Sequence, residues 1–429
     1  MKDIKSIHNY FLKCNSISID TRKIEPDSMF VAIKGDNFDA NTFVKEALEK
    51  GASYVIIDNI DYYIDERTIV VEDSLKTLQE LAKFHREYLN IPIIALTGSN
   101  GKTTTKELIH VVLSQKYNTK ATLGNLNNHI GVPLTLLSFT KDTEIGIVEM
   151  GANHQKEIEF LCEIAKPDFG YITNFGKAHL EGFGGVEGVI KGKSEMYTYL
   201  GYHHKTVFVN MNDPIQVEKT THINSFTFGL NTQNAEVLIN SITANPFVEV
   251  VVNDIKITSH LIGLYNSNNI NAAISMGIKF DVSISDIKSA IEGFVPQNNR
   301  SQMVTVNSNE IILDAYNANP SSMVVALENF FQLENKNKIA ILGDMFELGE
   351  ESLEEHKSIV ELIVKNNTIT TYFIGKDFFT NKIQNENCHF FLTFEDFAQN
   401  FNDKAINNSL LLIKGSRGMA LERTLQLLS

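Results

Sequence analysis

The stretch Thr97-Gly98-Ser99-Asn100-Gly101-Lys102-Thr103-Thr104-Thr105 continues an apolar run that begins at Ile91 and opens a segment with helical spacing at residues 102–116. A buried strand that passes through a glycine-rich turn into a helix directs backbone N–H groups and the positive helix end into one cavity, which suits a polyphosphate. Lys102 would reach the phosphates, and the Thr103 hydroxyl would bind Mg²⁺. Only two residues separate Gly98 from Gly101, whereas the usual P-loop has four. The stretch predicts a shortened phosphate-binding loop for a nucleotide.

On the C-terminal side of this loop, strand-like and helix-like segments alternate, which predicts a parallel sheet with helices on both faces. The predicted strands are residues 145–150, 169–173 and 206–210, and the predicted helices are residues 155–165 and 186–200. From residue 235 to residue 261 the pattern changes to alternating apolar and polar residues, which predicts antiparallel strands at one edge. Helices at residues 266–279 and 285–292 close this central part.

The length of 429 residues, at about 150 residues per domain, predicts about three domains. The first part has strand-like runs at residues 29–33 and 54–57 and helical spacing at residues 42–50 and 74–88. A polar stretch from Pro296 to Arg300 is typical of a linker, and strand-like runs recur after it at residues 311–314, 338–342, 371–374 and 410–413. We therefore predict an α/β protein with domains at residues 1–89, 90–297 and 298–429.

Composition excludes several classes of protein. Lys plus Arg number 38 and Asp plus Glu number 52, so the formal net charge is −14. An acidic chain without a basic block is poorly suited to nucleic acid or to an anionic membrane. Cys14, Cys162 and Cys388 form neither a disulfide framework nor a zinc motif, and no apolar run approaches the about 18 residues of a membrane span. With no signal-peptide pattern at the start, we expect a cytoplasmic protein without a membrane span.

Two polar side chains follow the strands next to the predicted loop. Glu149 ends the strand at residues 145–150, and His179 follows the strand at residues 169–173. Because the carboxyl ends of parallel strands meet at one edge of a sheet, both side chains are expected to face the same crevice as the loop. Glu149 is a candidate Mg²⁺ ligand, with a helix-capping carboxylate as the alternative. His179 is a candidate metal ligand or substrate contact, although a lone histidine is more often structural.

Three segments around the central sheet together resemble the Mur ligases, the ATP-dependent amino-acid ligases of peptidoglycan synthesis. They read Thr-Gly-Ser-Asn-Gly-Lys-Thr-Thr at residues 97–104, Glu-Met-Gly-Ala-Asn at residues 149–153 and Ala-His-Leu-Glu-Gly-Phe-Gly at residues 178–184. Three later segments are similar to the family members that add D-alanyl-D-alanine to UDP-N-acetylmuramoyl-tripeptide. They are Asp314–Met323, Leu342–Gly349 with His356 downstream, and Lys414–Met419. The likeness runs from about Ser18 to the C-terminus.

The resemblance implies an architecture and a reaction. It implies an N-terminal domain that binds UDP-MurNAc, a central P-loop ATPase domain and a C-terminal Rossmann-like ligase domain. The implied reaction uses ATP and two Mg²⁺ ions to form UDP-N-acetylmuramoyl-pentapeptide through an acyl phosphate. The implied substrates are UDP-MurNAc-tripeptide and D-alanyl-D-alanine, and the protein is expected to be a monomer.

The resemblance also implies roles for individual residues. Lys102 would hold the β- and γ-phosphates, and Lys193 matches the lysine that the family modifies to a carbamate, although helical spacing alone would make it an exposed lysine. The implied metal ligands are Thr103, Glu149, His179 and carbamylated Lys193. Besides the loop residues 97–104, the implied nucleotide contacts are Asn266, Asn269, Arg300, Asp314 and Tyr316. The implied substrate contacts are Ser18, Asp20, Thr21, Arg22, Lys34, Gly35, Asn127, Asn128, Asn317 and Asn319.

The chain departs from the family pattern at residues 299, 313 and 40. Asn299 stands where glycine is usual before the arginine, Leu313 stands where a second aspartate is usual, and Ala40 stands where glycine is common. The first and third changes affect the expected loop geometry, and the second leaves any role of the missing carboxylate open.

Three alternatives remain beside this interpretation: a different ligase of the same family, a non-ligase P-loop protein and a non-catalytic relative. A folylpolyglutamate synthetase is disfavoured because a further segment precedes the loop strand here, and a generic P-loop phosphotransferase or regulatory NTPase does not explain the later segments. A non-catalytic relative is disfavoured because Lys102, Thr103, Glu149, His179 and Lys193 are all present. A dinucleotide site at Gly182–Gly185 is rejected because that pattern follows no strand directly.

Overall fold

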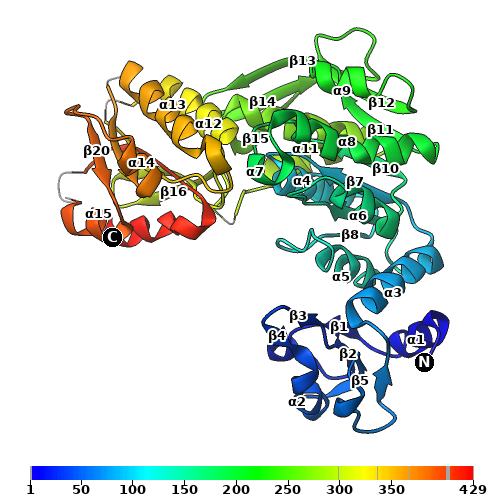
Figure 1. The fold of residues 1–429 in the computed structure, drawn as a ribbon. Helices are drawn as coiled ribbons and strands as arrows, with labels where there is room; N and C mark the ends of the chain where they lie inside the picture. Colours follow the sequence, from blue (N-terminus) through cyan, green and yellow to red (C-terminus); the bar gives the residue numbers. More distant parts are fainter. Residues whose placement is uncertain (1, 298, 336, 367, 402–405, 429) are drawn as a thin grey trace.

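The fold is α/β throughout, with sheets that follow one another along the chain (Figure 1). The structure is a computed structural model that describes residues 2–297, 299–335, 337–366, 368–401 and 406–428. In Figure 1 the N-terminal part (blue) lies below the central part (cyan to yellow-green), and the C-terminal part (yellow to red) lies to its left. Residue 298, the first residue of the predicted C-terminal domain, is outside the described residues. No described helix is long and apolar enough to cross a membrane.

The N-terminal part contains a parallel sheet and a small hairpin. The sheet strands, in spatial order, are β1 (Ser16–Ser18), β2 (Ser28–Val31), β5 (Ala52–Ile57) and β6 (Thr68–Val70). The hairpin joins β3 (Lys34–Gly35) to β4 (Phe38–Asp39), and the helices are α1 (Ile4–Phe11), α2 (Val44–Glu49) and α3 (Ser74–Leu89). The predicted strands at residues 29–33 and 54–57 and the predicted helix at residues 74–88 are therefore present.

Helix α3 ties the N-terminal part to the central part. Its Arg86 forms an ion pair with Asp168 at 2.8 Å and donates a hydrogen bond to the carbonyl of Ala165. Arg86 is buried, so its guanidinium is fixed by these partners rather than by solvent. The predicted boundary between residues 89 and 90 thus follows a helix that contacts both parts.

The central sheet is parallel around β7 and antiparallel at one edge. Its spatial order is β15-β14-β13-β12-β11-β10-β7-β9-β8. The strands are β7 (Ile93–Thr97), β8 (Thr119–Ala121), β9 (Ile145–Glu149), β10 (Phe169–Ile172), β11 (Thr206–Asn210), β12 (Ser225–Leu230), β13 (Val237–Ala244), β14 (Phe247–Val252) and β15 (Ile255–Ile262). The antiparallel ladders β13–β14 and β14–β15 confirm the predicted edge strands.

Helices cover both faces of the central sheet because β7 is apolar on both sides. Ile94 and Leu96 pack in one core cluster with α4, α10 and α11, and Ile93 and Ala95 pack in another with α5, α6 and α8. The helices are α4 (Lys102–Leu113), α5 (Gly131–Leu137), α6 (Glu157–Ala165), α7 (Leu180–Phe183), α8 (Val186–Tyr202), α9 (Pro214–Lys219), α10 (Ser267–Lys279) and α11 (Ile284–Gly293). The short elements β8 and α5 were not predicted.

The C-terminal sheet places two distant segments next to each other. Its spatial order is β16-β17-β21-β18-β19-β20, with β16 antiparallel to β17 and the other pairs parallel. The strands are β16 (Gln302–Val306), β17 (Asn309–Asp314), β18 (Lys338–Gly343), β19 (Thr370–Ile374), β20 (Cys388–Phe391) and β21 (Leu410–Lys414). The helices include α12 (Pro320–Gln332), α13 (Ser352–Lys365), α14 (Lys376–Thr380) and α15 (Phe394–Asn400). In the β17–β21 ladder, Asp314 is the register partner of Lys414.

Candidate active site between the central and C-terminal parts

A cavity of ≈ 760 Å³ lies where the carboxyl ends of the central strands face the C-terminal sheet. It brings together most of the nucleotide, metal and dipeptide contacts that the resemblance implies. The lining includes Ser99, Asn100, Gly101, Lys102, Thr103, Thr104, Asn127, Asn128, Glu149, His179, Asn266, Asn269, Arg300, Asp314, Tyr316, Asn317 and Asn319. Thr97, Gly98 and Lys193 do not line it.

The glycines of the loop are required by space as well as by backbone conformation. Gly98 has φ +146°, and a Cβ there would lie 1.9 Å from Oγ1 of Thr173. Gly101 has φ +79°, and a Cβ there would lie 2.6 Å from Oδ1 of Asn269. No described side chain caps the N-terminus of α4, so its first backbone N–H groups are available to an anion.

Lys102 is folded back onto its own loop. Its Nζ donates to the carbonyl of Gly98 at 2.7 Å and to that of Ser99 at 3.4 Å. Burial lowers the pKa of Lys102, with Glu149 opposing the shift and Arg300 adding to it. The ammonium is therefore held at the loop by two backbone carbonyls, and Lys102 lines the cavity.

Glu149 has one carboxylate oxygen with partners and one without. Oε1 accepts hydrogen bonds from Nδ2 of Asn127 at 2.8 Å and from Oγ1 of Thr103 at 3.4 Å. Oε2 is buried, and no hydrogen-bond partner for it is found in the part of the chain that the structure describes. Since its contacts are not helix N–H groups, the capping alternative does not apply. A buried carboxylate oxygen without a partner, next to a threonine hydroxyl, fits a divalent cation.

Lys193 is buried in α8 and is not the exposed lysine that helical spacing alone would suggest. Its Nζ lies 5.2 Å from the ring centroid of Phe183, and the described residues offer it no hydrogen bond or ion pair. Burial lowers the pKa of Lys193 well below its ordinary value, and the nearby charge of Lys102 lowers it further. Burial at this position thus disfavours the charged form of the amine.

The two asparagines implied as adenine contacts form one buried pair. Nδ2 of Asn269 donates to Oδ1 of Asn266 at 2.8 Å, and the Thr105 hydroxyl donates to Oδ1 of Asn269 at 3.0 Å. Nδ2 of Asn266 donates to the carbonyl of Ile262 at 2.8 Å. These contacts attach α10 to α4, so the pair sits directly behind the phosphate-binding loop.

The C-terminal side of the cavity carries two cations, Arg300 and Lys414, and the aromatic ring of Tyr316. The Arg300 guanidinium stacks 3.6 Å from the ring centroid of Tyr316, and the Lys414 ammonium forms a 2.6 Å ion pair with Asp314. Arg417 lies 4.8 Å from the same ring. Asn319 donates to Asn100 at 2.7 Å and so connects the C-terminal part to the loop.

Two features of this side bear on the sequence interpretation. Asn299, which replaces the usual glycine, has φ +57°, a conformation that asparagine tolerates better than most residues. Lys414 begins the Lys414–Met419 segment, but the sequence predicts no role for it, although it ends a buried strand at the cavity. Other lining residues that sequence reasoning missed are Asn125, His129, Asn153, Glu157, Tyr265 and Asn268.

The implied UDP-sugar contacts lie elsewhere, on the N-terminal part, and do not line the cavity. They are Ser18, Asp20, Thr21, Arg22, Lys34 and Gly35. Arg22 pairs with Asp20 at 2.8 Å and is largely exposed, and Lys34 and Gly35 form one strand of the exposed hairpin. The structure therefore groups them apart from the nucleotide residues.

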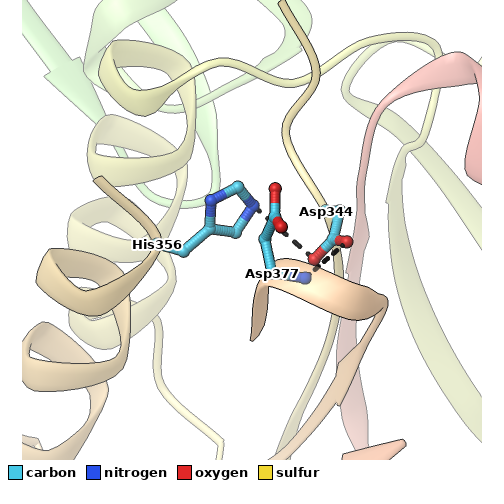
Figure 2. A group of neighbouring side chains, drawn as sticks. All are labelled: Asp344, His356 and Asp377. Atoms are coloured by element: carbon cyan, nitrogen blue, oxygen red, sulfur yellow. Dashed lines mark hydrogen bonds and ion pairs between the residues drawn. The ribbon is translucent and has the colours of Figure 1, made fainter. Parts of the chain in front are cut away.

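A second group of titratable side chains, Asp344, His356 and Asp377, resembles a metal site but serves as a cap (Figure 2). The Asp344 carboxylate accepts the backbone N–H groups of Asp377 and Phe378, each at 3.0 Å. His356 accepts from the N–H of Met345 at 2.9 Å, and its other ring nitrogen donates to the carbonyl of Ser352 at 2.7 Å. Because both ring nitrogens have partners, the group fixes the segment Leu342–Gly349 instead of binding a metal.

Comparison with known proteins agrees with this geometry. Family models match at residues 13–86 (Mur ligase family, catalytic domain), 96–277 (Mur ligase middle domain) and 299–417 (Mur ligase, glutamate ligase domain). A UDP-N-acetylmuramoyl-tripeptide–D-alanyl-D-alanine ligase of Bacillus subtilis is 33% identical over an alignment of 420 positions that covers 95% of this chain and 92% of that protein. The corresponding Escherichia coli ligase is 30% identical over an alignment of 435 positions that covers 96% of this chain and 93% of that protein.

Solved structures extend the likeness to the whole architecture. A crystal structure of MurF from Acinetobacter baumannii superposes with a TM-score of 0.86 at 28% identity, covering 99% of this chain and 97% of that one. MurF ligase from Thermotoga maritima in complex with ADP superposes with a TM-score of 0.82 at 26% identity, covering 100% and 98%. Together with the loop, the buried carboxylate and the buried lysine, these matches show that the chain belongs to the Mur ligase family.

Proposed function

We propose that the chain is an ATP-dependent ligase that joins D-alanyl-D-alanine to UDP-N-acetylmuramoyl-tripeptide in peptidoglycan precursor synthesis. The products are UDP-N-acetylmuramoyl-pentapeptide, ADP and phosphate. The observation that carries the proposal is the shared cavity, where the loop and Glu149 meet the Asp314–Met323 segment of the C-terminal part. The names of the full-length relatives in Bacillus subtilis and Escherichia coli support the choice of substrates.

ATP is proposed to span the cavity from the central to the C-terminal part. The first N–H groups of α4 and Lys102 would hold its phosphates, and Asn266 and Asn269 would contact its adenine. Arg300 and Asp314 would approach it from the opposite side. Use of ATP is supported by the ADP complex of the Thermotoga maritima relative.

Two Mg²⁺ ions are proposed at Thr103, Glu149, His179 and a carbamate on Lys193. Within the described residues, the Oε2 of Glu149 has no hydrogen-bond partner and the amine of Lys193 has no hydrogen bond or ion pair, and both features fit such a set. A carbamate forms when the neutral amine adds to the carbon of CO₂ and loses a proton, which puts an anion in place of the buried amine. Bound Mg²⁺ would neutralise the repulsion between the carboxylate and the phosphates and stabilise the transferring phosphoryl group.

The reaction is proposed to proceed in two steps. An oxygen of the tripeptide's terminal carboxylate attacks the γ-phosphorus, the bond to the β–γ bridging oxygen breaks, and ADP leaves. The amine of D-alanyl-D-alanine then attacks the acyl carbon and phosphate leaves as the amide forms. Lys102 is placed to balance the charge on the transferring group, and the two parts of the chain around the cavity would exclude water from the acyl phosphate.

The remaining assignments concern substrate binding and organisation. We propose that the N-terminal residues 18–22, 34 and 35 bind UDP-MurNAc, that Asn127 and Asn128 contact the peptide, and that Asn317 and Asn319 contact the dipeptide. Domains at residues 1–89, 90–297 and 298–429 are supported by the sheets, which each form within one of these ranges. We further propose that the protein is cytoplasmic, because both expected substrates are soluble anions, and that it is a monomer.

Phosphate release tests this proposal. With ATP, Mg²⁺ and UDP-N-acetylmuramoyl-tripeptide, the protein is expected to release phosphate only when D-alanyl-D-alanine is added, because only its amine resolves the acyl phosphate. L-alanyl-L-alanine and glutamate serve as controls. Equal rates with either control would contradict the choice of substrate, and release without any amine acceptor would indicate a simple ATPase.

A further inference from the structure

The segment Leu342–Gly349 reaches from the C-terminal part to a predicted metal ligand of the central part. Beyond β18, the carboxylate of Glu347 forms a hydrogen bond with Nδ1 of His179. The contact joins residues that are 168 positions apart in the chain. His179 lines the cavity together with Glu149, whereas Glu347 does not.

The contact determines which ring nitrogen of His179 faces the cavity as an acceptor. An imidazole nitrogen next to a carboxylate carries the proton and donates it, so the other nitrogen, Nε2, keeps its lone pair. Among the described residues Nε2 of His179 has no hydrogen-bond partner. Metal-binding histidines almost always hold their second nitrogen against a carboxylate or carbonyl in this way, which sets both tautomer and ring orientation.

Both backbones are held in an unusual conformation at this contact. His179 has φ +54° and Glu347 has φ +62°, in the left-handed region that residues other than glycine seldom adopt. Such conformations persist where the surrounding structure holds them. Here the two residues lie in the contact between the central part and the C-terminal part.

Other contacts fix the same interface around the His179 loop. The backbone N–H of Lys177 donates to the Ser321 hydroxyl at 2.6 Å, and the Lys177 ammonium pairs with Glu355 at 2.5 Å. Gly349 lies so close to Glu181 that an added Cβ would be 3.2 Å from its side chain. The Glu355 pair therefore crosses the same interface without touching a predicted metal ligand.

We infer that Glu347 is a positioning residue that presents Nε2 of His179 to the metal only when the C-terminal part is docked on the central part. This rests on the proposed function, because His179 is a metal ligand only within it. The arrangement links the two events: docking strengthens the metal site, and by reciprocity the metal at His179 favours docking. It also gives a role to Glu347, which the nucleotide and substrate assignments leave unexplained.

Mn²⁺ binding tests the inference without relying on turnover. Paramagnetic resonance would follow the titration of the full chain with Mn²⁺ in the presence of saturating β,γ-imido-ATP. The natural sequence is expected to bind two ions, and Glu347→Ala is expected to weaken one of the two sites, the one that includes His179, by about 10- to 100-fold, with the other site unchanged. Glu347→Gln, which keeps an acceptor oxygen for Nδ1, is expected to recover part of the affinity.

Glu355→Ala is the matched control, because it removes an acidic partner from the same interface away from His179. In this variant the loss of Mn²⁺ affinity should be much smaller than in Glu347→Ala, because the contact with His179 is kept. Equal weakening of Mn²⁺ binding by Glu355→Ala and Glu347→Ala would overturn the inference, since docking alone would then explain the effect. Unchanged Mn²⁺ binding in Glu347→Ala would overturn it too. Binding of a single Mn²⁺ by the natural sequence would overturn the proposed metal ligands as well.

Discussion

Replacing Lys193 by methionine is expected to lower kcat by about 10²- to 10³-fold or more, the range for loss of one preorganised charged group in an active site. Lys193 is buried, its pKa is lowered by burial and by Lys102, and its amine has no partner among the described residues. Methionine keeps most of the side-chain volume but cannot form a carbamate. Since the substitution also removes a buried amine without a partner, Tm is expected to stay the same or to rise.

Two comparisons separate the carbamate from other effects of this substitution. The natural sequence kept free of CO₂ should lose activity and regain it when bicarbonate is added, whereas Lys193→Met should not respond. In a ¹³C NMR spectrum, ¹³C-bicarbonate should give a carbamate resonance only when Lys193 is present. Lys191→Met, an exposed lysine on the same helix, is the matched control and should keep its activity. Near-normal turnover in Lys193→Met would contradict the proposal that a carbamate on Lys193 is needed for the reaction.

Replacing Glu149 by glutamine is expected to lower kcat by about 10²- to 10³-fold. Glutamine preserves the shape of the side chain and can keep the contact with Asn127, but it removes the negative charge from the buried oxygen that has no partner. A charge buried in that way does not stabilise the fold. Tm, measured by scanning calorimetry, is therefore expected to stay level or to increase while activity is lost.

The control for this substitution is Glu144→Gln, an exposed residue just before the same strand β9. It should leave both kcat and Tm close to their original values. Partial recovery of the Glu149→Gln rate at high Mg²⁺ would agree with the metal assignment. The opposite pattern, a lowered Tm with near-normal kcat, would show that Glu149 serves the fold instead of the reaction.

Local pattern was enough to predict that the loop, Glu149 and His179 lie at one edge of the central sheet. The loop at residues 97–105 lies between a strand and a helix, and Glu149 and His179 follow the two strands that pair with β7. Because the carboxyl ends of parallel strands lie at the same edge of a sheet, the positions of Glu149 and His179 at strand ends predicted that both face one crevice. Short elements escaped prediction, since the three residues of β8 and the seven of α5 carry little periodicity.

The C-terminal side of the cavity depends on contacts between segments that are far apart in the sequence, and local sequence pattern does not predict such contacts. Asp314 meets Lys414 because β17 pairs with β21, a strand 100 residues away, and Glu347 meets His179 across 168 residues. The burial of Lys193 likewise follows from the packing of Phe183 and α8, whereas its helical position alone suggested exposure. The resemblance to the Mur ligases supplied the Asp314 and Lys193 assignments; the Glu347 contact came from the structure.

Transfer of oxygen from the peptide to phosphate tests the central claim most directly. The measurement uses UDP-N-acetylmuramoyl-tripeptide labelled with ¹⁸O in its terminal carboxylate, together with ATP, Mg²⁺ and D-alanyl-D-alanine. Mass spectrometry then determines the ¹⁸O content of the released phosphate. An acyl phosphate leaves the attacking carboxylate oxygen on phosphorus, so each phosphate is expected to carry one ¹⁸O for each pentapeptide formed. Phosphate without ¹⁸O would mean that water attacked the nucleotide, and it would contradict the proposed ligase.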